Sequence, residues 1–299
     1  GPIKSKLVPK VGSTAKILYT IYIVLTAAEA VALRIAGMSW FDAVNHAFTT
    51  MATGGFSVRN TSIASYQSDA ITWVIVVFTF LAGINFSLLY AVVRGRIKDA
   101  LRSEELRWYL LILAITIGLI CVDLHVELGQ GWYESAKDAA FQATTIMSTT
   151  GYATKDFTLW PTFSRCILVL LMYVGGCAGS TAGGMKVSRL MLQVKSLRRE
   201  LDHIIHPNRV SVITMDGQSV DEKAVTSAHM FQVAYLLILM AGTLVVSLDV
   251  LGFTESFVAS LTCISNVGPS LGTLGPMANF APLAGFRKLV LVTIMLMGR

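Results

Sequence analysis

Apolar runs alternate along the chain with shorter stretches of mixed polarity, and the lengths of the runs indicate helices in a membrane. Six runs stand out, at residues 17–37, 71–93, 108–122, 162–178, 229–251 and 286–298. Several approach the roughly 20 residues that a helix needs to cross about 30 Å of hydrocarbon. The pattern therefore predicts an all-α integral membrane protein.

Semi-polar stretches lie between these runs, at residues 40–57, 134–153 and 254–270. Each is too short and too polar to cross a bilayer, and each is followed by another apolar run. This profile is typical of a re-entrant segment, in which a short helix and a loop dip into the membrane.

The three semi-polar stretches align with one another without gaps, on Gly55, Gly151 and Gly268. In this frame an acid lies thirteen positions before every glycine and a threonine six positions before it: Asp42, Asp138 and Glu255, and Thr49, Thr145 and Thr262. We expect the acids to cap the positive N-termini of the short helices. The agreement predicts internal repeats, each reading span, short helix, polar loop and span. The repeats are assigned to residues 1–107, 108–228 and 229–299, the last truncated in its final span.

Composition supports the membrane assignment. Of the 299 residues, 54% are hydrophobic and only 14% are charged, against about 25% charged residues in soluble domains. The net charge of +6 comes from basic residues clustered between the apolar runs, so membrane orientation explains it and no nucleic-acid partner is expected. The cysteines lie in or beside apolar segments and are expected to be packing residues: Cys121, Cys166, Cys177 and Cys263.

The basic clusters also predict how the chain is oriented. They lie at residues 4–16, 94–107 and 186–209, each before the first span of a repeat. The positive-inside rule makes that side cytoplasmic, so the glycine-centred loops enter from outside. A polar insert at 199–228 carries Pro207 and Asp216-Gly217, which predict a turn or small hairpin. Charged residues near the ends of first spans are expected to be interfacial or helix-pairing: Glu29, Arg34, Asp123, His125 and Glu127.

The loops at the ends of the short helices carry the candidate chemistry. Their residues are Thr53, Gly54, Gly55 and Phe56; Thr149, Thr150, Gly151 and Tyr152; and Asn266, Val267, Gly268 and Pro269. Backbone carbonyls and threonine hydroxyls replace the water shell of a monovalent cation, and the C-terminal end of a helix favours positive charge. Ordinary tight turns are the alternative for any single loop, but three loops in one register favour a cation filter.

A further glycine-rich stretch, "GGCAGSTAGGMK" at residues 175–186, follows an apolar run directly. A phosphate-binding loop would place a lysine directly after a glycine, whereas Met185 separates Gly184 from Lys186 here. Gly176 falls partway down its span, as Gly83 does in the first repeat. Non-helical backbone at that depth is tolerated where it is buried in protein or lines water. A loop in a pore and a packing site between helices are the two interpretations.

Together with "NVGP" and "LAGINFSLLY" (residues 81–90), this stretch gives the chain a family resemblance. The chain resembles the ion-translocating subunit of the Trk/Ktr/HKT superfamily of potassium transporters, and within it the bacterial TrkH type. That family has four helix–loop–helix repeats, arranged pseudo-fourfold around one pore. This sequence matches the second, third and fourth repeats, which implies that the first is missing. Because Asn266–Pro269 lacks the threonine pair, the resemblance implies a less regular coordination than in a tetrameric channel.

The resemblance implies potassium uptake across the bacterial inner (plasma) membrane, with K⁺ bound at the filter residues and no other cofactor. It also implies a homodimer and a cytoplasmic nucleotide-binding regulatory subunit of the TrkA kind. An intramembrane loop would gate the path beneath the filter, with Lys186 at the cytoplasmic mouth or simply the first basic residue beyond the span. The gating residues are then Gly175, Gly176, Cys177, Ala178, Gly179, Ser180, Thr181, Ala182, Gly183, Gly184, Lys186 and Arg299.

Two alternatives to potassium uptake stay open. The first is a sodium-permeable or sodium-coupled transporter of the same superfamily, although the glycine kept in all three loops favours potassium. The second, more remote, is a membrane enzyme or ATPase subunit. It would require acidic, histidine or nucleotide motifs at membrane depth, and the sequence offers none that is convincing.

Overall fold

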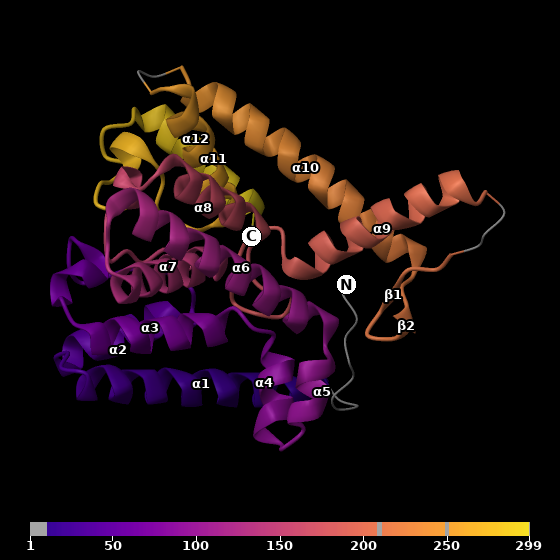
Figure 1. Cartoon of the computed structure of the whole chain (residues 1–299), viewed down its shortest axis with the longest axis horizontal. Helices are drawn as coiled ribbons and strands as arrows, with labels where there is room; N and C mark the ends of the chain where they lie inside the picture. The colour runs from indigo at the N-terminus through magenta and orange to yellow at the C-terminus, as the bar shows by residue number, and fades with distance from the viewer. Residues whose placement is uncertain (1–10, 208–210, 249–250, 299) are drawn as a thin grey trace.

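The computed structural model describes residues 11–207, 211–248 and 251–298, with side chains from residue 15 onward. Within these ranges the chain is mostly helical, and its few strand residues form a two-stranded sheet. Figure 1 shows the helices of the first repeat on one side of the body, those of the third on the other, and those of the second between them. The repeats therefore follow one another in space in the order that they have in the sequence.

The first repeat consists of α1 (Val11–Ile35), α2 (Trp40–Met51), α3 (Asp69–Ala82), α4 (Phe86–Val93) and α5 (Ile97–Arg102). The short helix α2 begins at Ser39, whose hydroxyl oxygen accepts a hydrogen bond from the Asp42 amide at 3.1 Å. Helix α2 packs against both α1 and α3. One face of α2 is therefore buried against these helices, while Trp40, Phe41 and Phe48 on its other side are exposed.

The second repeat consists of α6 (Glu104–Leu128), α7 (Trp132–Met147), α8 (Thr162–Val174) and α9 (Val187–Ile205). The short helix α7 packs against α6 and α8 of its own repeat and against α3 of the first. Every residue of its last two turns is buried. This helix therefore occupies the centre of the described structure.

The third repeat consists of α10 (Glu222–Val246), α11 (Phe253–Ser265) and α12 (Gly285–Gly298). Its short helix α11 packs against α10, α12 and α8 of the preceding repeat. Each short helix of the second and third repeats therefore contacts a helix of the repeat before it. Cys177 and Cys263 are buried, whereas Cys166 is exposed and Cys121 is intermediate.

The first helices of the repeats contain segments that are long and apolar enough to cross a membrane unbroken, at Ala15–Ile35, Glu104–Leu128 and Glu222–Val246. Two of the second helices are shorter than the expected spans, because α3 and α8 have only 14 and 13 residues. At 1.5 Å per residue, such helices reach only about 20 Å. The expected span over 71–93 is not one continuous helix, since α3 and α4 meet at an angle of 104°.

The repeat limits drawn from hydropathy at 107/108 and 228/229 fall inside helices. Helix α6 begins at Glu104 and helix α10 at Glu222, because charged first turns extend both helices beyond their apolar parts. The hairpin predicted in the polar insert is confirmed as β1 (Thr214–Met215) paired antiparallel with β2 (Gln218–Ser219). Positive φ angles at Asp216 and Gly217 make the two-residue turn between these strands. Figure 1 shows the hairpin and α9 projecting from the helical body.

Candidate functional site

The three loops that follow the short helices share one backbone conformation. In each, the first residue and the glycine two positions later both have positive φ angles: Thr53 and Gly55 (51° and 65°), Thr149 and Gly151 (56° and 83°), and Asn266 and Gly268 (57° and 110°). Residues other than glycine adopt this left-handed conformation at a cost. The same costly conformation at the same position in three segments indicates that the three loops are structurally equivalent.

The aligned threonine six positions before each glycine explains how this conformation is held. The Thr49 carbonyl accepts hydrogen bonds from Gly54 N at 2.7 Å and from Gly55 N at 3.3 Å. The Thr145 carbonyl accepts the corresponding bonds from Thr150 N and Gly151 N at 2.9 and 3.1 Å. These bonds fold each loop back onto the last turn of its own helix.

The third loop uses its threonine in a slightly different way. The Thr262 carbonyl accepts a hydrogen bond from Val267 N, and the Thr262 hydroxyl accepts one from Gly268 N, both at 2.9 Å. The threonine hydroxyl thus accepts one of the two hydrogen bonds that the threonine carbonyl accepts in the first and second loops. The threonine column that the alignment found is therefore structural, and its members lie behind the loops.

The loops touch one another in sequence. A Cβ atom on Gly55 would collide with the Thr150 carbonyl oxygen, and one on Gly151 would collide with the Val267 carbonyl oxygen. A Cβ atom on Gly268 would meet no described atom within 4 Å. The three loops therefore form an arc of closely packed backbone in which the glycines make the contacts possible.

Tyr152 connects the second loop to the first short helix. Its side chain is fully buried, and its hydroxyl lies 2.6 Å from the Thr49 hydroxyl and donates to the His46 carbonyl at 3.2 Å. Phe56, at the equivalent position of the first loop, is exposed, and its carbonyl accepts a hydrogen bond from the Thr49 hydroxyl at 2.9 Å. The same position in two loops therefore carries an aromatic residue in opposite surroundings.

The aligned acids do not all cap helices as expected. Asp42 and Glu255 lie in the first turns of α2 and α11, but Asp138 lies in the middle of α7, whose first turn carries Glu134 instead. The expectation fails at Asp138 because α7 begins further upstream than α2 and α11 do. All three acids instead reach the chain that follows the loops.

Two of these acids have pKa values shifted in opposite directions. Burial acts to raise the pKa of Asp42, but Tyr66 and the Arg59 guanidinium outweigh it and hold the pKa below its usual range. At Asp138, burial dominates over the nearby Lys155 ammonium and raises the pKa. Burial therefore outweighs the ion pair at Asp138, whereas the partners outweigh burial at Asp42.

The glycine-rich stretch at 175–186 forms a loop that interrupts the second repeat between α8 and α9. Gly175 begins the loop with a φ of 73° and contacts Gly183 and Gly184, so the two ends of the loop pass close together. The amides of Met185 and Lys186 donate to carbonyls of the last turn of α8, at 3.2 and 3.0 Å. The Lys186 ammonium donates to the Ala182 carbonyl within the loop. Most of the loop is buried, as sequence reasoning required for backbone at this depth.

This loop lies directly against the first residues of two glycine loops. The Thr53 hydroxyl donates to the Thr181 carbonyl at 2.9 Å, and the Thr149 hydroxyl accepts from Gly183 N at 2.6 Å. A Cβ atom on Gly183 would collide with the Ser265 carbonyl, which immediately precedes the third loop. Loop 175–186 therefore contacts all three segments at their left-handed residues or just before them.

The break between α3 and α4 supports the same loop from the other side. Cys177 N donates to the Gly83 carbonyl at 2.9 Å, and Phe86 N donates to the Gly179 carbonyl at 3.2 Å. Gly176 approaches the Gly83 carbonyl closely, so the two glycines lie at one level, as their positions along the spans predict. The break between α3 and α4 and loop 175–186 thus form hydrogen bonds with each other's backbone groups, which have no partner within a helix.

Glu105 is a site residue that sequence reasoning missed. Its carboxylate is buried and accepts hydrogen bonds from Ala178 N at 2.6 Å and from Ser188 N at 3.2 Å. It thereby joins the loop to the first turn of α9, whose N-terminus favours a negative charge. The available signal was an acid at the start of an apolar span, in a link where basic residues outnumber acids.

The remaining predicted gating residue, Arg299, lies outside the described residues. The preceding Gly298 is described, and it packs against the carbonyl of Ile264 near the end of α11. The Asn266 side chain donates to the Met295 carbonyl at 3.1 Å, which ties the third loop to α12. The third loop is therefore anchored to its own second helix, whereas the first two hold loop 175–186.

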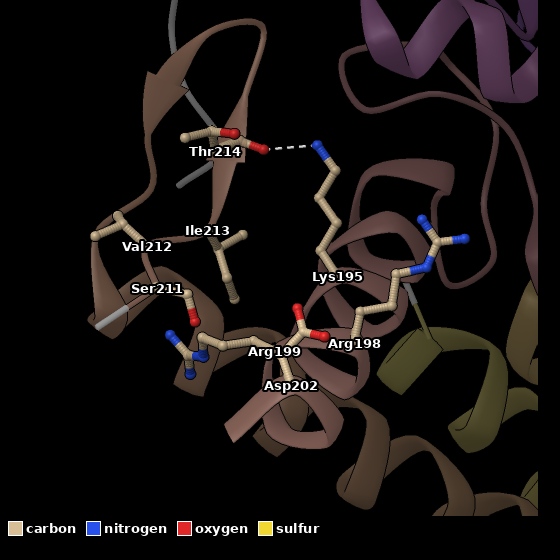
Figure 2. A pocket seen from close by; sticks show the side chains of 8 residues that line it. All are labelled: Lys195, Arg198, Arg199, Asp202, Ser211, Val212, Ile213 and Thr214. Atoms are coloured by element: carbon tan, nitrogen blue, oxygen red, sulfur yellow. Dashed lines mark hydrogen bonds between the residues drawn. The ribbon is translucent and has the colours of Figure 1, made fainter. Parts of the chain in front are cut away.

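A pocket of about 210 Å³ lies away from these loops, between α9 and the segment before β1. Figure 2 shows Lys195, Arg198 and Arg199 at its rim, with Lys195 donating to the Thr214 carbonyl at 2.6 Å. Lys195 also pairs with Glu104, and Arg199 pairs with Glu222. An anion here would have to displace these carboxylates, so the pocket adds no phosphate site to the chain.

Comparisons with known proteins agree with the arrangement of the repeats. The family model for TrkH, described as a cation transport protein, matches residues 3–299. The crystal structure of the potassium transporter TrkH from Vibrio parahaemolyticus is similar over 98% of this chain and 63% of that one, with a TM-score of 0.90 and 33% identity. The predicted all-α membrane fold is confirmed by this similarity.

Among curated proteins, the Trk system potassium uptake proteins TrkH of Salmonella typhimurium and Halomonas elongata are 34% and 35% identical to the chain. Both alignments include 100% of this chain and 62% of the relative. The chain thus spans less than two thirds of the length of these relatives.

Proposed function

Because the chain belongs to the TrkH family of cation transport proteins, we propose that it forms three repeats of a potassium uptake path in the bacterial inner membrane. One observation carries the proposal: three loops with the same left-handed pattern pack against one another at the ends of three short helices. The relatives named above are potassium uptake proteins. Residues 1–103, 104–221 and 222–299 are the units that the helix limits support.

The filter is assigned to Thr53–Phe56, Thr149–Tyr152 and Asn266–Pro269. Short helices end directly before these loops, so their negative ends lie where a cation would bind. The loop backbones are fixed by hydrogen bonds to the helix behind them. A rigid ring of oxygens selects by size and field strength, which favours potassium. The alternative function is that the same loops let sodium permeate.

The gate is assigned to residues 175–186, with Arg299 as the proposed electrostatic partner. Two hydroxyls of the filter loops bind this loop directly. A loop in contact with the lower ends of the filter obstructs an ion path, and a few single hydrogen bonds hold it there. We assign its glycines to close packing and movement.

The proposed assembly is a homodimer with a cytoplasmic nucleotide-binding regulatory subunit of the TrkA kind. The basic links place α9 and the hairpin on the cytoplasmic side. Both elements project from the helical body, where a regulatory partner has access to them (Figure 1). The signal from that partner would reach loop 175–186 through α9, which begins directly after it.

Rubidium uptake by the full-length protein in liposomes tests the function. Uptake driven by an outward potassium gradient, with sodium uptake measured in parallel, separates the two cations. Gly151→Ser is expected to reduce rubidium over sodium preference, because the filter glycine has a φ of 83° and no room for a side chain. Absent rubidium uptake by the unmodified protein contradicts the function; an unchanged preference in the variant contradicts the filter assignment.

Deletion of residues 179–183 tests the gate separately. Without the regulatory subunit, the shortened loop is expected to raise basal uptake, because the contacts to Thr53 and Thr149 are removed. Protein that stays closed would favour a packing role for the loop. Gly217→Ala in the turn of the hairpin, where a Cβ atom would meet no described atom within 4 Å, serves as a control.

A further inference from the structure

We propose that in each repeat a carboxylate on the short helix holds the outer end of the filter loop and thereby sets how well the filter discriminates between cations. This inference rests on the function proposed above. The acid lies thirteen residues before the filter glycine in all three repeats, and its partner lies four or five residues after that glycine. The three carboxylates are positioning residues, since none of them belongs to the filter itself.

In the first repeat the partners are Asp42 and Arg59. The Asp42 carboxylate, with 7% of its side chain exposed, lies 3.1 Å from the Arg59 guanidinium. Arg59 N also donates to the Ser57 hydroxyl at 3.1 Å, and Ser57 lies 2.9 Å from the buried ring of His46. The chain leaving the loop is therefore bound to α2 through two side chains of that helix.

In the second repeat the partners are Asp138 and Lys155. The Asp138 carboxylate, with 2% of its side chain exposed, lies 2.6 Å from the Lys155 ammonium. Gln142, one turn further along α7, donates to the Tyr152 carbonyl at 3.4 Å. The same helix face thus again binds the chain on the far side of the loop.

In the third repeat the carboxylate also binds the chain after the loop, but its partner is a backbone amide and not a basic side chain. Gly272 stands where the other repeats have Arg59 and Lys155, and the Glu255 carboxylate accepts a hydrogen bond from Thr273 N at 2.8 Å. A Cβ atom on Gly272 would collide with that carboxylate. The missing side chain gives the carboxylate room to reach the backbone, so glycine here serves the function that a basic residue serves elsewhere.

The link is needed because the loop conformation is costly. Thr53, Thr149 and Asn266 hold left-handed conformations that residues other than glycine avoid. The threonine carbonyls fix the start of each loop, and the carboxylates fix the chain four or five residues beyond its glycine. A filter free to relax at one end would lose the fixed oxygen geometry on which cation discrimination depends.

The test compares two lysines of the second repeat in the full-length protein. Lys155→Gln removes the partner of Asp138, whereas Lys137→Gln removes a lysine of α7 that pairs with Asp69 at 2.7 Å and Glu134 at 2.9 Å. Both variants remove one positive charge close to Glu134, which lies 2.9 Å from Lys137 and 3.9 Å from Lys155, and only Lys155→Gln breaks the pair with Asp138. Initial rates of rubidium and sodium uptake into liposomes give the discrimination ratio for each.

We expect the ratio to fall about fivefold in Lys155→Gln, the equivalent of about 1 kcal/mol, and to keep its original value in Lys137→Gln. The double variant Asp138→Lys with Lys155→Asp restores the pair in reverse and should recover the ratio. An unchanged ratio in Lys155→Gln, or an equal fall in both single variants, would overturn the inference. Absent rubidium uptake in the unmodified protein would instead overturn the proposed function, so the two failures are distinguishable.

Gly272→Ala supplies a second variant that changes no charge. The added methyl group displaces the Glu255 carboxylate from Thr273 N, and the expected result is the same kind of fall in the ratio. Gly252→Ala is its control, since a Cβ atom there meets no atom of the described residues within 4 Å. An unchanged ratio in Gly272→Ala contradicts the extension of the inference to the third repeat.

Discussion

The filter loops and loop 175–186 are both glycine-rich backbone without helical structure, yet they are held in different ways. Each filter loop is bound chiefly to the helix that precedes it, by repeated hydrogen bonds to one threonine. Loop 175–186 is bound also by groups from other parts of the chain: Thr53, Thr149, Met51, Gly83 and Glu105. A segment held by its own helix keeps its shape, whereas a segment held by distant groups is released when those groups shift.

The largest expected effect breaks the contact between filter loops. Gly55→Ala forces a methyl group onto the Thr150 carbonyl, at a position with a φ of 65°. Because the obstacle is backbone, we expect a loss of about 3 kcal/mol or more in the free energy of unfolding, together with loss of rubidium uptake. Thermal unfolding in detergent and uptake in liposomes measure the two.

The matched control for this variant is Gly217→Ala in the hairpin. Gly217 has a similar φ of 76°, but a Cβ atom there meets nothing within 4 Å. Only the left-handed strain applies, about 1 kcal/mol, and uptake should be unaffected. Equal losses in the two variants would show that strain, and not the packing of the loops, decides the result.

A smaller effect should release loop 175–186 and leave the filter intact. Glu105→Ala leaves the buried amides of Ala178 and Ser188 without their acceptor, which costs about 1–3 kcal/mol. The closed position of the loop loses that stabilisation, so basal uptake should rise while the rubidium-to-sodium ratio stays constant. The same uptake measurements, made without the regulatory subunit, give both quantities.

Glu104→Ala is the neighbouring control for Glu105→Ala. Glu104 pairs with Lys195 at the partly exposed start of α6, and such a pair contributes about 0–1 kcal/mol. Its loss should leave basal uptake unchanged. A similar rise in both variants would assign the effect to helix α6 as a whole and not to the loop.

The smallest effect is expected when a single hydroxyl is removed from loop 175–186. Thr181→Val keeps the side-chain shape but loses hydrogen bonds to the Met51 carbonyl at 3.0 Å and the Ala82 carbonyl at 3.3 Å. We expect a destabilisation of about 1 kcal/mol and a modest rise in basal uptake. Thr61→Val, in an exposed turn, should change neither quantity. Altered cation preference in Thr181→Val would contradict the separation between filter and gate.

Much of the fold followed from the sequence because hydropathy and register are local properties. Apolar length gave the first helix of every repeat, and the gap-free alignment on Gly55, Gly151 and Gly268 gave the three loops. The same alignment identified the threonines, although their role behind the loops needed coordinates. Hydropathy failed at the second helix of the first repeat, because a 104° bend at residues 83–85 leaves the apolar composition unchanged.

The sequence by itself determined the repeats, the positions of the glycines and the membrane class, since these depend on residue types at fixed spacings. Only the tertiary structure decided what the aligned acids bind: Asp42 and Glu255 lie in first helical turns as expected and Asp138 does not, yet all three hold the chain beyond the loops. It also decided that Glu105 holds loop 175–186, across more than seventy residues of chain. Such pairings depend on which backbone groups remain open after the helices have packed, and no local pattern records that.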